Sequence, residues 1–103
     1  MQDQILRKFF LGFIQIHILH HAKQEPFYGA WMMDELKEHG YDMSPGTLYP
    51  LLHKMEAKGV LEKEEKNIDG KIRKYYKITT LGSEVLEEAR RKAYELFKEI
   101  KDK

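Results

Sequence analysis

The sequence predicts a mainly α-helical domain that carries one β-hairpin, an α+β fold, and three observations support this prediction. Apolar residues recur at helical spacing in four segments, the spacing changes to alternation between residues 60 and 79, and an Asp-Gly dipeptide divides the alternating region. A chain of 103 residues with 42% hydrophobic content can build one small core. We therefore expect a single compact domain that gains part of its stability from a second subunit.

The first two predicted helices differ in how their apolar residues are distributed. Residues 4–21 are apolar around most of a helix circumference, which predicts burial on more than one side. The segment from Tyr28 to Glu38 predicts a second helix with Ala30, Met33 and Leu36 facing inward and an end near Gly40. The apolar residues of the first helix are Ile5, Leu6, Phe9, Phe10, Phe13, Ile14, Ile16, Ile18 and Leu19.

The third predicted helix begins at Ser44. We expect the Ser44 side chain to cap it by accepting a backbone N–H, and Pro45 suits the first helical position, where an N–H would have no partner. Together with the second helix and the short turn at residues 41–43, it matches a helix-turn-helix unit, whose second helix enters the DNA major groove. One face of the third helix carries the apolar stripe Leu48, Leu51, Leu52 and Met55.

The alternating region predicts a β-hairpin. Its strands are expected at Val60–Lys66 and Ile72–Thr79, joined by Asn67-Ile68-Asp69-Gly70. Tyr76 and Ile78 share a face that would pack on the helices, which makes the hairpin the wing of a winged helix-turn-helix domain. The opposite face of the second strand carries Arg73, Tyr75 and Lys77.

The final segment predicts a long amphipathic helix. Thr79 or Thr80 can cap it, and apolar residues continue at heptad spacing to about Lys101. Because a monomer would expose this stripe, we expect the helix to dimerise with help from the first helix. The chain then divides into a winged helix-turn-helix domain over residues 1–80 and a C-terminal dimerisation helix over residues 81–103. The predicted dimerisation residues are Leu86, Ala89, Ala93, Leu96, Phe97 and Ile100.

Positive charge gathers in the predicted wing. The whole chain has a net charge of only +1, but residues 66–77 hold five positive residues against one acidic residue, a local charge of +4. Such a cluster can neutralise phosphates and release counterions, which indicates double-stranded DNA as the partner. A winged-helix module that docks a protein and never touches DNA is the alternative. The predicted DNA-binding residues are Ser44, Gly46, Thr47, Tyr49, Pro50, His53 and Lys54 in the third helix, and Lys71, Arg73, Lys74 and Tyr75 in the wing.

The middle of the chain closely resembles the PadR family of transcriptional regulators. The motifs that carry the resemblance are Tyr28-Gly29, the run Ser-Pro-Gly-Thr-Leu-Tyr-Pro at residues 44–50, Gly59, and Arg73-Lys74-Tyr75-Tyr76. The resemblance covers Phe27 to about Leu86 and implies a dimeric repressor that binds a palindromic operator. The wing would lie on the neighbouring backbone or in the minor groove. The single short last helix is similar to the small subfamily, in which that helix forms the dimer and borders an effector cavity.

The resemblance also implies release of the repressor by a small-molecule effector. Multidrug-sensing relatives stack planar ligands on a Trp of the last helix, whereas the single Trp of this chain, Trp31, lies in the second helix. The candidate effector residues are instead Phe9, Phe13, Tyr94 and Phe97.

Other chemistries find little support in the sequence. The chain has no Cys, which excludes disulfides, thiolate catalysis and Cys-based zinc sites. No Ser–His–Asp order, phosphate-binding loop or carboxylate pair indicates catalysis, so we expect no enzyme and assign no catalytic residue and no cofactor. The apolar run of the first helix is too short and too polar to cross a bilayer, so we expect a cytoplasmic protein with no membrane contact.

Three histidines in the first helix raise a metal-responsive sensor as a further alternative. His17 and His21 are four residues apart and could share one ion, with His20 beside them. No neighbouring carboxylate or Cys in the sequence completes the ligand set, and two histidines seldom suffice. We therefore assign no metal ligand from the sequence.

Overall fold

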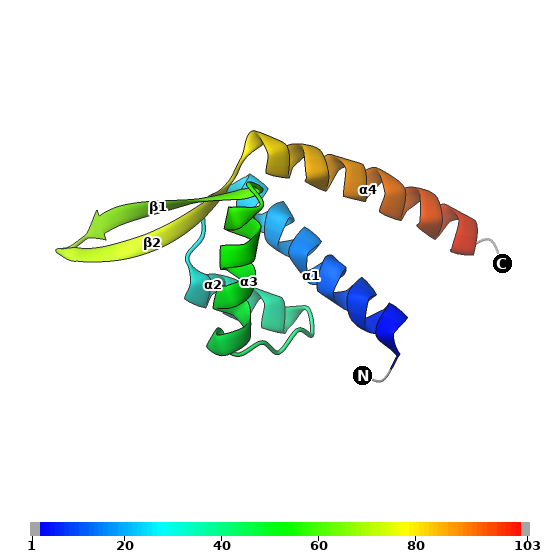
Figure 1. Ribbon diagram of the computed structural model, residues 1–103, viewed down its shortest axis with the longest axis horizontal. Coiled ribbons are helices and arrows are strands. Elements are labelled where there is room, and N and C mark those ends of the chain that lie inside the picture. Colours follow the sequence, from blue (N-terminus) through cyan, green and yellow to red (C-terminus); the bar gives the residue numbers. More distant parts are fainter. Residues whose placement is uncertain (1–2, 102–103) are drawn as a thin grey trace.

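The computed structural model describes residues 3–101, which form four helices and a two-stranded antiparallel hairpin (Figure 1). The predicted fold class is confirmed, although α1 continues past residue 21 and both strands of the hairpin reach its turn. In chain order the elements are α1 (Gln4–Gln24), α2 (Gly29–Glu38), α3 (Pro45–Ala57), β1 (Leu61–Ile68), β2 (Lys71–Ile78) and α4 (Thr80–Lys101).

The hydrophobic core lies where the second half of α1, α2, α3 and the base of the hairpin meet. The predicted stripe of α3 is buried, but the predicted inner face of α2 is partly wrong, because Ala30 is exposed and Met33 is half-buried. α2 begins at Gly29, and its buried residues are Gly29, Met32 and Leu36. The core residues are Ile18, Leu19, Ala22, Phe27, Met32, Leu36, Leu48, Leu51, Leu52, Met55, Leu61 and Tyr76.

The hairpin is a regular two-stranded ribbon with a tight turn. Its register runs from the pair Leu61 and Ile78 at the base to the pair Ile68 and Lys71 at the tip. Asp69 and Gly70 form the turn with φ angles of 53° and 82°, the left-handed conformation that a two-residue turn of this twist requires at both positions. At the base, Tyr76 is buried, and its backbone exchanges two hydrogen bonds with Phe27. The hairpin is thereby anchored to the segment that leads into α2.

In the single chain the first half of α1 is exposed, so burial on more than one side stays a prediction that requires a second subunit. Only Ile18, Leu19 and Ala22 of this helix are buried, and Ile5 is 79% exposed. α1 and α4 contact each other near the hairpin, where Ile16 and Val85 line one shared hollow, and the two helices separate toward the chain ends (Figure 1). The radius of gyration, 15.0 Å, is larger than the roughly 13 Å of a compact domain of about 100 residues. Among residues 3–101, no helix has the length and apolar character needed to cross a membrane.

Thr79 stabilises the junction between the hairpin and α4. It is one of the two residues that the sequence predicted as the cap of the last helix. The hydroxyl of Thr79 accepts a hydrogen bond of 2.9 Å from the Gly82 N–H and donates one of 2.6 Å to the Gly59 carbonyl. Gly82 is buried against Val60 and Ile78. The direction in which α4 leaves the domain is therefore fixed by the loop that precedes β1.

Candidate nucleic-acid interface

The solvent-facing side of α3 carries every residue of this helix that the sequence assigned to DNA binding. Leu48, Leu51, Leu52 and Met55 face the core, and the other side is open. The predicted capping role of Ser44 is wrong, because its side chain makes no cap hydrogen bond and its hydroxyl lies 3.3 Å from that of Thr47. Pro45 occupies the start of the helix as predicted. The exposed candidates in α3 and at its cap are Ser44, Gly46, Thr47, Tyr49, Pro50, His53 and Lys54.

Gly29 makes room for the ring of Tyr49. A Cβ atom at residue 29 would lie 2.6 Å from Cζ of Tyr49, far inside van der Waals contact. Only glycine leaves room for the ring, which therefore rests on the first turn of α2 and remains 38% exposed. Tyr49 thus joins α2 to α3 and still presents a surface to a ligand.

Two cations of the wing pack against tyrosine rings. The Arg73 guanidinium lies 4.4 Å from the ring centroid of Tyr28, and the Lys66 ammonium lies 4.9 Å from that of Tyr75. Tyr28 and Tyr75 meet edge to face, with centroids 5.7 Å apart. Lys66 and Arg73 are direct cross-strand partners, an arrangement that like charges disfavour unless each has a compensating contact. The rings provide that contact, so the wing keeps its positive charges close together.

The positive charge lies in the distal half of the hairpin. β1 adds acidic residues to the basic ones, so Leu61–Ile78 carries six positive and four acidic side chains. Two of the acidic residues, Glu62 and Glu64, belong to the half of β1 nearer its base, and Glu65 lies opposite Lys74 further along the hairpin. Lys77, which the sequence counts with the wing, pairs with Glu62 at the base. The cationic surface is therefore smaller than the sequence predicted and is centred on Lys66, Lys71, Arg73 and Lys74.

An open hollow joins the two predicted groups of DNA-binding residues. It has a volume of about 570 Å³, and its lining includes Tyr49 and His53 from α3 and Arg73 and Lys74 from β2. Ser44, Gly46 and Thr47 lie at the other end of α3, away from the hairpin (Figure 1). Of the predicted wing residues, only Tyr75 is half-buried.

Two residues that position this surface were absent from the predicted site. Tyr28 supports Arg73, and Gly29 accommodates Tyr49. The signal in the sequence was the Tyr-Gly pair at the start of the second helix, which the family resemblance included without giving it a physical role.

The exposure of the predicted dimerisation residues increases along α4 toward its C-terminal end. Leu86 packs against the core, whereas Leu96, Phe97 and Ile100 are more than half exposed. Of the candidate effector residues, Phe9 and Phe13 stack on α1 with centroids 5.1 Å apart, while Tyr94 and Phe97 project from α4. The two pairs lie on separate arms of the single chain (Figure 1).

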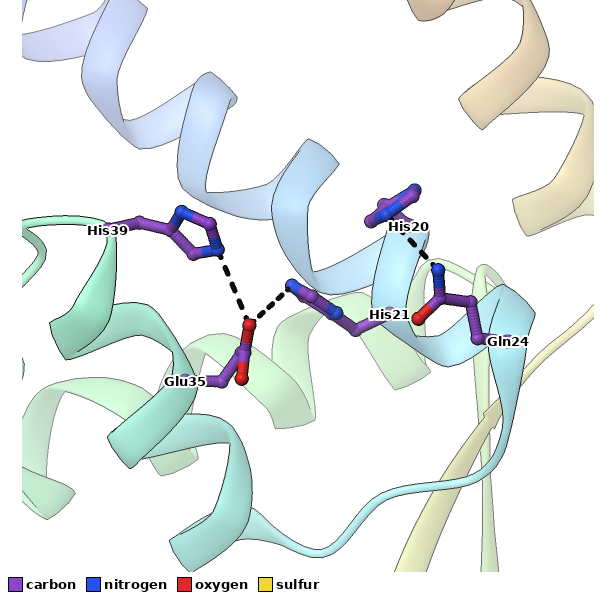
Figure 2. Close-up of polar contacts among 5 residues, drawn as sticks. All are labelled: His20, His21, Gln24, Glu35 and His39. Carbon is purple, nitrogen blue, oxygen red and sulfur yellow. Dashed lines mark hydrogen bonds and ion pairs between the residues drawn. The ribbon is translucent and has the colours of Figure 1, made fainter.

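A cluster of histidines and one carboxylate lies between α1 and α2. His17 and His21 of α1 lie close to His39, which follows α2, and the three imidazoles place one nitrogen each within 4.8 Å of one another. Figure 2 shows His21 and His39 both directed at Glu35, whose Oε2 atom lies 3.4 Å from Nε2 of each ring. His20 points away and contacts Gln24. Burial lowers the pKa of His17, as do the neighbouring histidines, and burial lowers the pKa of His21 against the opposing effect of Glu35.

The chain is similar to regulators of transcription over most of its length. The family described as "Transcriptional regulator PadR-like family" matches residues 18–88. Transcriptional regulator Rv3488 of Mycobacterium tuberculosis is 45% identical over 95 residues, which cover 92% of this chain and 89% of that protein. A PadR-like transcriptional regulator of Bacillus cereus superposes with a TM-score of 0.83 at 32% identity, over 97% of this chain and 95% of the other. A PadR family transcriptional regulator of Eggerthella lenta superposes with a TM-score of 0.73 at 31% identity, over 95% of this chain and 90% of the other.

Proposed function

The chain belongs to the PadR-like family of transcriptional regulators, and on that premise we propose that it is a homodimeric, sequence-specific DNA-binding protein that acts as a repressor. The observation that carries the proposal is the hollow between α3 and the wing, where Tyr49 and His53 face Arg73 and Lys74. α3 would read base edges in the major groove, and the cationic half of the hairpin would contact the adjacent backbone. The proposal gives the chain no catalytic role and places it in the cytoplasm, beside the DNA that it binds.

The apolar faces of α1 and α4 support a dimer. Large side chains at Phe9, Leu11, Leu96, Phe97 and Ile100 are each at least 45% exposed in the single chain. Apolar patches of this extent mark interaction surfaces, and a two-fold axis through them would pair α1 and α4 with their copies. Two recognition helices related by that axis match a palindromic operator when they lie about 34 Å apart or a larger whole number of turns.

Release by a small-molecule effector is the form of regulation that we propose. In a dimer the aromatic pairs Phe9 with Phe13 and Tyr94 with Phe97 would border the interface, where an apolar ligand could change the separation of the two recognition helices. Thermal-shift screening of apolar compounds tests this. A true effector should raise the melting temperature and weaken operator binding, and Tyr94→Ala should remove both effects.

DNA binding is tested by the salt dependence of affinity for a random-sequence duplex. Lys71→Ala combined with Arg73→Ala removes two phosphate contacts per protomer, so binding should weaken for all sequences. The slope of log affinity against log salt should flatten by about 0.9 per lost contact, or roughly 3.6 for the dimer.

The matched control removes the same charge elsewhere. Lys92→Ala with Lys98→Ala changes α4, far from α3 and the hairpin, and should leave both affinity and slope unchanged (Figure 1). Equal behaviour of the two double variants would remove the wing from the interface. Failure of the unmodified protein to bind duplex or heparin at low salt would instead favour a protein-docking module.

A further inference from the structure

We propose that His17, His21, His39 and Glu35 bind one divalent transition-metal ion of the Zn²⁺ type, which would tie α1 to α2. The four side chains come from consecutive turns of α1 and from the last turn and the end of α2. This site is separate from the DNA-facing hollow, and its existence does not depend on DNA binding.

The distances match a site that needs only small side-chain adjustments. In tetrahedral coordination with metal bonds of about 2.0–2.1 Å, ligand atoms lie roughly 3.3 Å apart. The Glu35 carboxylate oxygen lies 3.4 Å from Nε2 of His21 and of His39. The three imidazoles offer nitrogens within 4.8 Å of one another, so small rotations of the rings, above all of the exposed His39, can bring the remaining pairs to that spacing.

The polar atoms of the cluster do not satisfy one another. Nε2 of His21 is buried and has no hydrogen-bond partner within residues 3–101. Its contact with Glu35, at 3.4 Å, is longer than the 2.7–3.2 Å of a good N–H···O hydrogen bond. A buried polar atom left in this way lowers stability, and a metal ion would supply the missing partner. His39, 40% exposed at its side chain, leaves a path for the ion from solvent.

The donor set selects the class of ion. Three imidazole nitrogens and one carboxylate oxygen in a tetrahedral arrangement suit Zn²⁺, and Co²⁺ binds the same type of site. Oxygen-preferring ions such as Mg²⁺ and Ca²⁺ require several carboxylate or carbonyl ligands, which this cluster does not offer.

An ion at this point would fix α1 against α2. α2 is the first helix of the helix-turn-helix, and α1 carries the apolar face proposed for the dimer, so the ion would join the DNA-binding unit to the dimer interface.

The test measures metal binding by the full chain in the absence of DNA. After treatment with a chelator, the protein is titrated with Co²⁺, which absorbs visible light strongly in tetrahedral sites, and then with Zn²⁺ as competitor. We expect one ion per chain, and at saturating Zn²⁺, about 100 times the dissociation constant, a rise in melting temperature of roughly 10 °C. A flat Co²⁺ titration with no Zn²⁺-dependent rise would overturn the proposal.

Single variants assign the ion to these residues. His21→Ala and His39→Ala should each weaken binding by at least about tenfold, since even outer-sphere partners of metal ligands contribute that much. The exposed position of His39 makes its variant safe for folding, and Glu35→Gln removes the charge with little change in size. His20→Ala and His53→Ala are the controls, because neither residue belongs to the cluster. Equal loss in the controls, or no loss in His39→Ala, would show that the ion binds elsewhere and refute the assignment.

Discussion

Gly82→Ala tests how α4 is fixed to the winged domain. A Cβ atom at residue 82 would lie 2.8 Å from Cγ1 of Ile78 and would overlap the Val60 carbonyl oxygen. Because a carbonyl is part of the backbone, it cannot rotate away as a side chain would. α4 must therefore move outward, and the hydrogen bond from the Gly82 N–H to the Thr79 hydroxyl is lost.

The size of the effect follows from these two losses. Inserting a methyl group into a packed contact costs about 1–3 kcal/mol, and loss of a threonine cap costs about 1 kcal/mol. The better helix propensity of alanine returns up to about 1 kcal/mol. The net destabilisation is about 1–3 kcal/mol, which lowers the melting temperature of a chain of this size by roughly 4–20 °C.

Thermal unfolding followed by circular dichroism provides the assay, at one protein concentration because the stability of a dimer depends on it. Gly46→Ala is the matched control, since its Cβ would meet nothing closer than the Ser44 hydroxyl oxygen at 3.8 Å. Its melting temperature should equal that of the unmodified protein or exceed it by up to several degrees, because alanine favours the helix. A Gly82→Ala melting temperature within about 2 °C of the control would refute the close approach of α4 to the loop before β1.

Two further predictions concern the dimer and the wing. Phe97→Glu introduces a charge at a position that is 60% exposed in the single chain and that a dimer formed through α4 would bury. The dimer should dissociate, and light scattering should then report half its mass. An unchanged mass would contradict the dimer proposed through this face. Tyr28→Leu removes the ring beneath Arg73, which is worth about 0.5–1 kcal/mol, so DNA affinity measured by fluorescence anisotropy should fall about two- to fivefold. Tyr28→Phe keeps the ring and should bind normally, and equal losses in both variants would exclude a role for the cation–ring contact.

Local patterns in the sequence were sufficient for most of the fold. The stripe Leu48, Leu51, Leu52 and Met55 predicted the buried face of α3, and it is buried. The Asp69-Gly70 dipeptide predicted the turn of the wing, and both residues adopt the left-handed conformation. These predictions succeeded because helix periodicity, strand alternation and turn chemistry depend on residues that are close together in the chain.

Local patterns failed where two assignments were equally compatible with them. The periodicity of α2 allowed either Ala30 or Met32 to face inward, and the packing of the helix on the core buries Met32. Serine is a residue type that often caps helices, but the Ser44 hydroxyl faces the Thr47 hydroxyl instead of a backbone N–H. The apolar first half of α1 predicted burial, but a local pattern does not identify the surface that packs against it.

By itself, the sequence determined the helix-turn-helix, the wing and the polar side of α3, because each follows from the spacing of neighbouring residues. The tertiary structure alone decided which distant residues meet: Gly29 with Tyr49, Tyr28 with Arg73, and the α1 histidines with Glu35 and His39. The physical reason is that such contacts depend on how helices and strands cross. Crossing geometry is set by the packing of the whole core, which no local pattern encodes.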